Sequence, residues 1–170
     1  QALINAERPW VMIQVKEDEM TAGRDSDSVG LWGKREIQFI MFNFGKTPAH
    51  ILTCTEPKFE HPDSPENELP IPPQYGPSDA TKRFLAPRDS LPVSTWFNPS
   101  ERAVHAIAER AIKGQHSRGS LVVYGLVEYS DGVAKTAYKT AFCYRWERST
   151  ISSVGGRFIP CGPKVYNEYT

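Results

Sequence analysis

The chain has 170 residues, a length typical of one domain that buries a core without disulfides or metal. Hydrophobic residues make up 39% and charged residues 24%, which argues against a disordered chain. The 20 Lys and Arg residues balance the 20 Asp and Glu residues, so the excess of basic charge that nucleic acids and anionic membranes attract is absent.

Three strands are predicted near the N-terminus. Apolar residues alternate at period two over residues 11–16, which is typical of a strand with one buried face. Residues 36–44 are apolar on both faces, which favours a central strand covered on each side. Turn-forming residues 43–48 then lead into a third strand at residues 49–55.

Residues 57–99 hold most of the 14 prolines of the chain. Proline lacks the N–H group that a sheet ladder needs, so this segment predicts a long loop, with central strands disfavoured over residues 57–77. The simplest interpretation is a loop that wraps over a sheet edge, and the alternative is a functional loop. A short edge strand is predicted at residues 91–97.

One α-helix is predicted at residues 99–113. Asn98 is a favourable N-cap, Pro99 suits the first helical position, and Glu101 stands three residues after the cap, which completes a capping box. Apolar residues recur at helical spacing until Gly114, a typical helix stop.

Asp131 and Gly132 predict a β-hairpin. They separate residues 120–130 from residues 133–146, two runs of alternating apolar character, and Asp-Gly is a strong signal for a tight hairpin turn.

A two-residue hairpin loop would set the register of this pair. It would place Glu128 opposite Lys135 as an ion pair, and Gly125 opposite Tyr138, whose ring would cover the bare glycine backbone. A bulge would shift this register.

These elements together predict the fold class and the domain limits. We expect a mainly β protein, an immunoglobulin-like antiparallel β-sandwich with one α-helix in a crossover connection. Residues 9–170 form the single domain. Residues 1–8 are a fair helix former that ends at Pro9, and we interpret them as the end of a helical linker.

The cysteines are Cys54, Cys143 and Cys161, too few for a disulfide framework. Cys54 and Cys143 occupy predicted strands, where a free cysteine usually acts as a small buried apolar residue. A bridge between Cys143 and Cys161 stays open, because sequence cannot test its geometry.

No catalytic, metal or nucleotide motif is found, and the chain is predicted to be non-enzymatic and to need no cofactor. Gly45-Lys46-Thr47 resembles the end of a phosphate-binding loop, but Ile40 stands where that motif requires glycine. His50 and Cys54 have ligand-like spacing, yet four residues of strand span roughly 13 Å, too far for one zinc ion.

Exposed aromatic residues are the best candidates for a binding surface. Trp10 and Trp146 lie at predicted strand ends, where large aromatics cap a sandwich core. Trp32, Tyr75 and Trp96 are therefore the candidates for a ligand or partner surface.

The chain resembles a group of uncharacterised bacterial membrane-anchored proteins. In such proteins, one or two transmembrane helices and a short helical linker precede a soluble β domain. The resemblance covers most of the chain in short patches, at residues 2–11, 43–49, 124–129, 140–144 and 161–163.

This resemblance implies a location and no activity. We expect a membrane segment before Gln1, and the side of the membrane depends on flanking Lys and Arg that precede this sequence. The predicted role is a protein-interaction or assembly module that binds another protein or itself and no nucleic acid. The alternative is a carbohydrate- or small-ligand-binding domain that uses Trp32, Tyr75 and Trp96.

Overall fold

The computed structural model describes residues 8–15, 35–60, 69–79, 83–97, 122–132, 136–148 and 156–170. The predicted helix at residues 99–113 lies outside them. Over the described residues the chain is mainly β, and its strands and single 3₁₀ turn are, in order, β1 Val11–Val15, β2 Arg35–Asn43, β3 Ala49–Thr55, β4 Lys58–Glu60, β5 Ser78–Asp79, β6 Arg83–Leu85, β7 Ser90–Phe97, β8 Val122–Ser130, β9 Ala137–Arg148, β10 Gly156–Pro160 and η3 Lys164–Tyr166.

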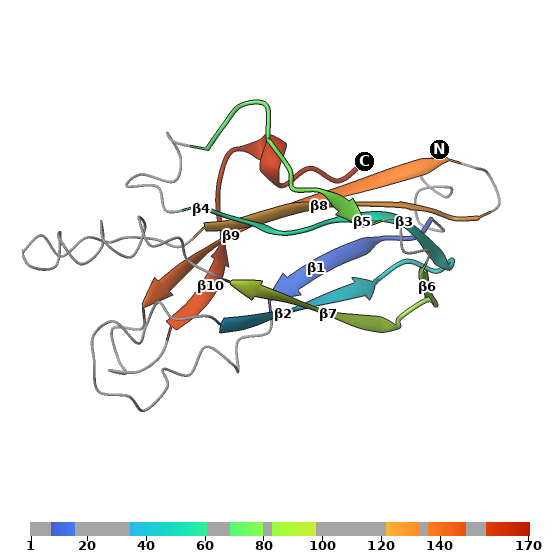
Figure 1. The fold of residues 1–170 in the computed structure, drawn as a ribbon. Helices are drawn as coiled ribbons and strands as arrows, with labels where there is room; N and C mark the ends of the chain where they lie inside the picture. Colours follow the sequence, from blue (N-terminus) through green and yellow to red (C-terminus); the bar gives the residue numbers. More distant parts are fainter. Residues whose placement is uncertain are drawn as a thin grey trace, which may run out of the picture.

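The strands form two antiparallel sheets that pack as a sandwich (Figure 1). The small sheet has the order β1-β2-β7. The large sheet has the order β10-β9-β8-β3-β5, with β4 paired to β8 and β6 paired to β3. This arrangement confirms the antiparallel sandwich that the strand patterns predict.

The apolar residues that recur at period two form the buried faces of the strands. In β2, Ile37, Phe39 and Met41 are buried, whereas the residues between them are half-buried. As predicted, β2 lies between two partners, and β7 is an edge strand that carries Pro92. An edge position accommodates this proline, because among the described strands only β2 pairs with β7 and the other side of β7 has no ladder partner.

The edge strand expected at residues 91–97 is present as β7, but the expectation that the rest of residues 57–99 forms one long loop is wrong, because β4, β5 and β6 also lie within it. The prolines do not prevent this, since β4 to β6 are only two or three residues long and fit between them. β4 continues the course of β3 along β8 after a break at Pro57. At this break, the Leu126 N–H donates to Thr55 Oγ1 at 2.8 Å, which replaces a ladder hydrogen bond.

The β8–β9 hairpin exists, but its predicted register is wrong. The strands are joined by residues 131–136 instead of by two residues, so Glu128 pairs with Lys139 and Gly125 pairs with Phe142. The shift is by four residues, an even number, so each residue of β9 keeps the face that its pattern predicts. A Cβ atom added to Gly125 would lie 2.6 Å from the Phe142 ring, so an aromatic ring does cover this glycine.

The main core lies between the two sheets. Apolar side chains from β1 and β2 meet those of β3, β8 and β9, and the Phe39 and Phe142 rings pack at 5.8 Å. Two side chains of β9 cross the sandwich to the backbone of β1: Thr140 donates to the Val11 carbonyl and Tyr144 to the Ile13 carbonyl. Carbonyl groups at the edge of the small sheet thereby gain partners inside the molecule.

A second cluster of buried residues lies on the opposite face of the large sheet, where η3 packs (Figure 1). Its cover comes from residues 69–75 of the Pro-rich segment and from residues 161–170. The end of the chain also pairs with β9: the Ala141 N–H donates to the Glu168 carbonyl at 2.9 Å, and the Thr170 N–H to the Lys139 carbonyl at 3.0 Å.

Arg8 is the first residue that the structure describes. Its guanidinium lies 4.1 Å from the centre of the Trp10 ring and 5.5 Å from that of Tyr138. Arg8 therefore packs on aromatic side chains of the sandwich. Residues 1–7 lie outside the described ranges, so the helical linker stays a prediction.

Candidate functional site

Of the three aromatic residues predicted as a ligand or partner surface, only Tyr75 has a described side chain. Trp32 lies outside the described ranges, and Trp96 is placed only by its backbone pairing with Glu36. The Tyr75 ring is half-buried and packs edge-on against Tyr124 at 6.2 Å. Burial is the largest cause that raises the pKa of Tyr75. Tyr75 thus contributes to the second cluster, and the ligand-binding alternative stays a prediction.

The turn that follows β2 is organised by the buried side chain of Asn43. Asn43 Oδ1 accepts the N–H groups of Trp10 at 3.2 Å and Gly45 at 2.9 Å. Asn43 Nδ2 donates to the carbonyls of Thr47 at 2.9 Å and Leu85 at 3.2 Å. A Cβ atom on Gly45 would collide with the backbone around Pro9, so glycine is needed for this close approach. The residues that resemble part of a phosphate-binding loop therefore join three segments of the fold.

An exposed apolar patch lies on the large sheet, and we call His50, Leu52 and Phe84 the β3–β6 patch. Phe84 is 60% exposed and Leu52 is 37% exposed. Phe84 pairs with His50 across the two strands, and their rings meet edge-on at 5.4 Å. The patch reaches the β8–β9 hairpin, since a Cβ atom on Gly132 would lie 2.5 Å from His50 Nε2. Sequence patterns missed it because β6 lies in the segment predicted as a loop.

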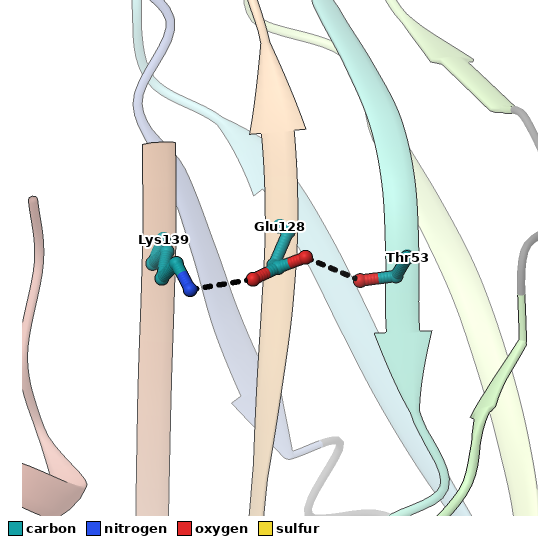
Figure 2. Close-up of polar contacts among 3 residues, drawn as sticks. All are labelled: Thr53, Glu128 and Lys139. Atoms are coloured by element: carbon teal, nitrogen blue, oxygen red, sulfur yellow. Dashed lines mark hydrogen bonds and ion pairs between the residues drawn. The ribbon is translucent and has the colours of Figure 1, made fainter. Parts of the chain in front are cut away.

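A polar ladder crosses three neighbouring strands of the large sheet (Figure 2). Glu128 of β8 forms an ion pair with Lys139 of β9 at 2.7 Å and accepts a hydrogen bond from Thr53 Oγ1 of β3 at 3.2 Å. The hydrogen bond from Lys139 is the largest of the effects that hold the pKa of Glu128 below its ordinary value, and Thr53 adds to it. All charges of this ladder have partners, which is typical of a structural ion pair.

The structure brings Cys143 and Cys161 together, the pairing that the sequence left open. Their sulfur atoms lie 3.5 Å apart, and both side chains belong to the second cluster. Cys143 is fully buried and Cys161 is half-buried. Cys54 is half-buried, and burial is the main reason why the pKa of its thiol is raised.

The described part of the chain contains no group of three or more His, Cys, Asp or Glu residues able to hold a metal ion. In the same residues no helix combines the length and the apolar character that crossing a membrane requires. Comparison with protein-family models and with curated proteins found no match.

Proposed function

We propose that this chain is the extramembrane β domain of a membrane-anchored bacterial protein and that it acts, without catalysis, as a module for protein interaction or assembly. The anchor rests on the resemblance carried by residues 2–11, 43–49 and 140–144. The interaction role rests on one observation, the β3–β6 patch.

The β3–β6 patch has the chemistry of a contact surface. The Phe84 ring is held by its contact with His50 on a strand pair, so a partner would meet a side chain whose position is already restricted. Covering a phenylalanine contributes about 1.5–3 kcal/mol, and aromatic residues are enriched at protein interfaces. A sheet also presents such residues more rigidly than a loop does.

The patch lies beside a short edge of the large sheet. β6 pairs with β3 over only three residues, and the described part of the sheet continues no further on that side. An edge of this kind is a site where another chain can pair its backbone. A partner that adds main-chain hydrogen bonds here would cover Phe84 at the same time.

Substitution of the patch tests this role. We expect Phe84→Ser to weaken capture of the partner from detergent-solubilised host membranes by about tenfold or more, as loss of a contact worth about 1.5–3 kcal/mol requires. Ile71→Ser is the matched control, because Ile71 is 71% exposed and lies outside the patch. Both variants should keep the unfolding midpoint of the parent protein.

Two results would contradict the proposal. One is a specific partner whose capture is equal for the parent, Phe84→Ser and Ile71→Ser. The other is an upstream reading frame that lacks an apolar stretch of about 20 residues, the length that a membrane-spanning helix needs.

A further inference from the structure

Cys143 and Cys161 are cross-strand neighbours. The β9–β10 pairing runs to Tyr144 opposite Pro160, and one further step brings Cys143 opposite Cys161. The Cys161 N–H donates to the Cys143 carbonyl at 3.0 Å, so the ladder does extend to this pair. Opposite residues that share such a bond have Cα atoms about 5.5 Å apart, which is within the ~4.4–6.8 Å that a disulfide spans.

The side chains of this pair point toward each other in a confined place. Their sulfur atoms are 3.5 Å apart. Gly162 follows with a φ of 84°, and a Cβ atom there would lie 3.1 Å from Cys143 Sγ, so the backbone turns closely over the buried thiol. Because Cys161 is half-buried and Cys143 is fully buried, only Cys161 offers a direct approach to a reagent.

We propose that Cys143 and Cys161 form a reversible disulfide that fastens residues 161–170 to β9. This segment carries Tyr166, which is fully buried and whose ring meets Tyr124 edge-on at 5.0 Å. It also forms the backbone pairing that ends at Thr170. The disulfide, which we call the clasp, therefore links residues 161–170 covalently to β9 and keeps this segment packed over the second cluster.

The chemistry requires an oxidant, and a small-molecule disulfide such as oxidised glutathione supplies it. The Cys161 thiolate attacks one sulfur of this reagent, the reagent's S–S bond breaks, and one glutathione leaves as a thiolate. Cys143 then attacks the Cys161 sulfur of the mixed disulfide and releases the second glutathione. The two cysteines lose two electrons and two protons, and the reagent becomes two glutathione thiols.

The environment of Cys143 fits this order of events. Its hydrogen bond with Cys161 is the largest cause that raises the pKa of the Cys143 thiol, and burial adds to it. A raised pKa lowers the reactivity of the buried Cys143 thiol toward the reagent, so the first attack comes from the half-buried Cys161.

Peptide mapping of the full chain tests the clasp. After oxidised glutathione, a digest without reductant should contain one linked species that joins the peptides of Cys143 and Cys161, and dithiothreitol should remove it. Closing a loop between residues 18 apart in the sequence should raise the Tm by about 5–10 °C. The Thr170 and Ala141 amides should exchange hydrogen more slowly in the oxidised protein.

Two variants distinguish the effects of the Cys143–Cys161 pair from those of the third cysteine, Cys54. Cys161→Ser should remove both the linked species and the Tm response to oxidation, whereas Cys54→Ser should keep both. If Cys161→Ser does not fold, the peptide map of the parent protein still decides. A glutathione adduct that persists on Cys161, a link that involves Cys54, or no link at all would overturn the proposal.

Discussion

Asn43 occupies a position where few other residue types could make the same hydrogen bonds. Its oxygen accepts two backbone N–H groups, and its nitrogen donates to the carbonyls of Thr47 in the turn and of Leu85 in β6. Aspartate has the same shape but offers no N–H donor when ionised, and alanine offers neither function. Because Asn43 is fully buried, water does not take over the abandoned partners.

We expect Asn43→Ala to lower the free energy of unfolding by about 3 kcal/mol, because the buried Gly45 N–H and Leu85 carbonyl lose a partner, at about 1–3 kcal/mol each, and partly buried groups lose theirs as well. Asn43→Asp should be at least as damaging near neutral pH. The control is Asn167→Ala: the side chain of half-buried Asn167 donates one hydrogen bond, to the Cys161 carbonyl, and its loss should cost about 1 kcal/mol. Urea denaturation measures all three, and an equal loss for Asn43→Ala and Asn167→Ala would contradict this role.

At the scale of elements, the β8–β9 hairpin shows that the predicted types of cross-strand contact can be present although the predicted register is wrong. Lys135 and Lys139 are four residues apart, as are Tyr138 and Phe142. The two residues of each pair have similar side chains. In either register, therefore, Glu128 lies opposite a lysine and Gly125 lies opposite an aromatic ring. The sandwich selects the observed register because it places Phe142 against Phe39 in the main core.

The Glu128–Lys139 pair predicts a pH dependence. Since the folded protein lowers the pKa of Glu128, the resulting stabilisation is complete above the ordinary glutamate pKa and is lost as the pH falls through the lowered value. We expect about 0.3–1 kcal/mol of coupling between Glu128→Gln and Lys139→Met in a double-mutant cycle at pH 7, because both side chains are partly exposed.

The coupling should vanish in strong acid and diminish with added salt. Glu56→Gln removes the same charge from an exposed side chain and serves as the control. A coupling energy that is unchanged in acid would show that the ion pair is not its source.

At the scale of the whole molecule, the large sheet buries apolar residues on both faces. The small sheet packs on one face, and residues 69–75 with residues 161–170 cover part of the other. Tyr166 connects the two parts of the second cover, because its hydroxyl donates to the Pro70 carbonyl at 2.6 Å. Tyr144, which spans the main core to β1, is buried enough to raise its pKa to about 12.

This cover should contribute to global stability. We expect Tyr166→Ala to lower the free energy of unfolding by about 3–5 kcal/mol, as truncation of a fully buried aromatic side chain does. Tyr169→Ala should cost less than about 1 kcal/mol, because Tyr169 is 45% exposed. Denaturant melts report both values, and a small effect of Tyr166→Ala would mean that the segment is only loosely attached.

The sequence by itself determined the elements whose signals are local. Period-two alternation predicted β1 and its buried face, apolar residues on both faces predicted β2 as a central strand, and the turn at residues 43–48 led to β3. Pro92 was compatible with an edge strand. The turn after β2 was recognised from its residue types, although not the role of Asn43. Asp131-Gly132 predicted that a hairpin exists.

Only the tertiary structure decided what depends on residues distant in sequence. The hairpin register follows from packing against the other sheet, because an even shift leaves the alternation unchanged. The short strands β4 to β6 exist because β3 and β8 offer them partners, not because of their own composition. The β3–β6 patch and the Cys143–Cys161 contact arise in the same way, since each joins two strands through pairings that no local pattern encodes.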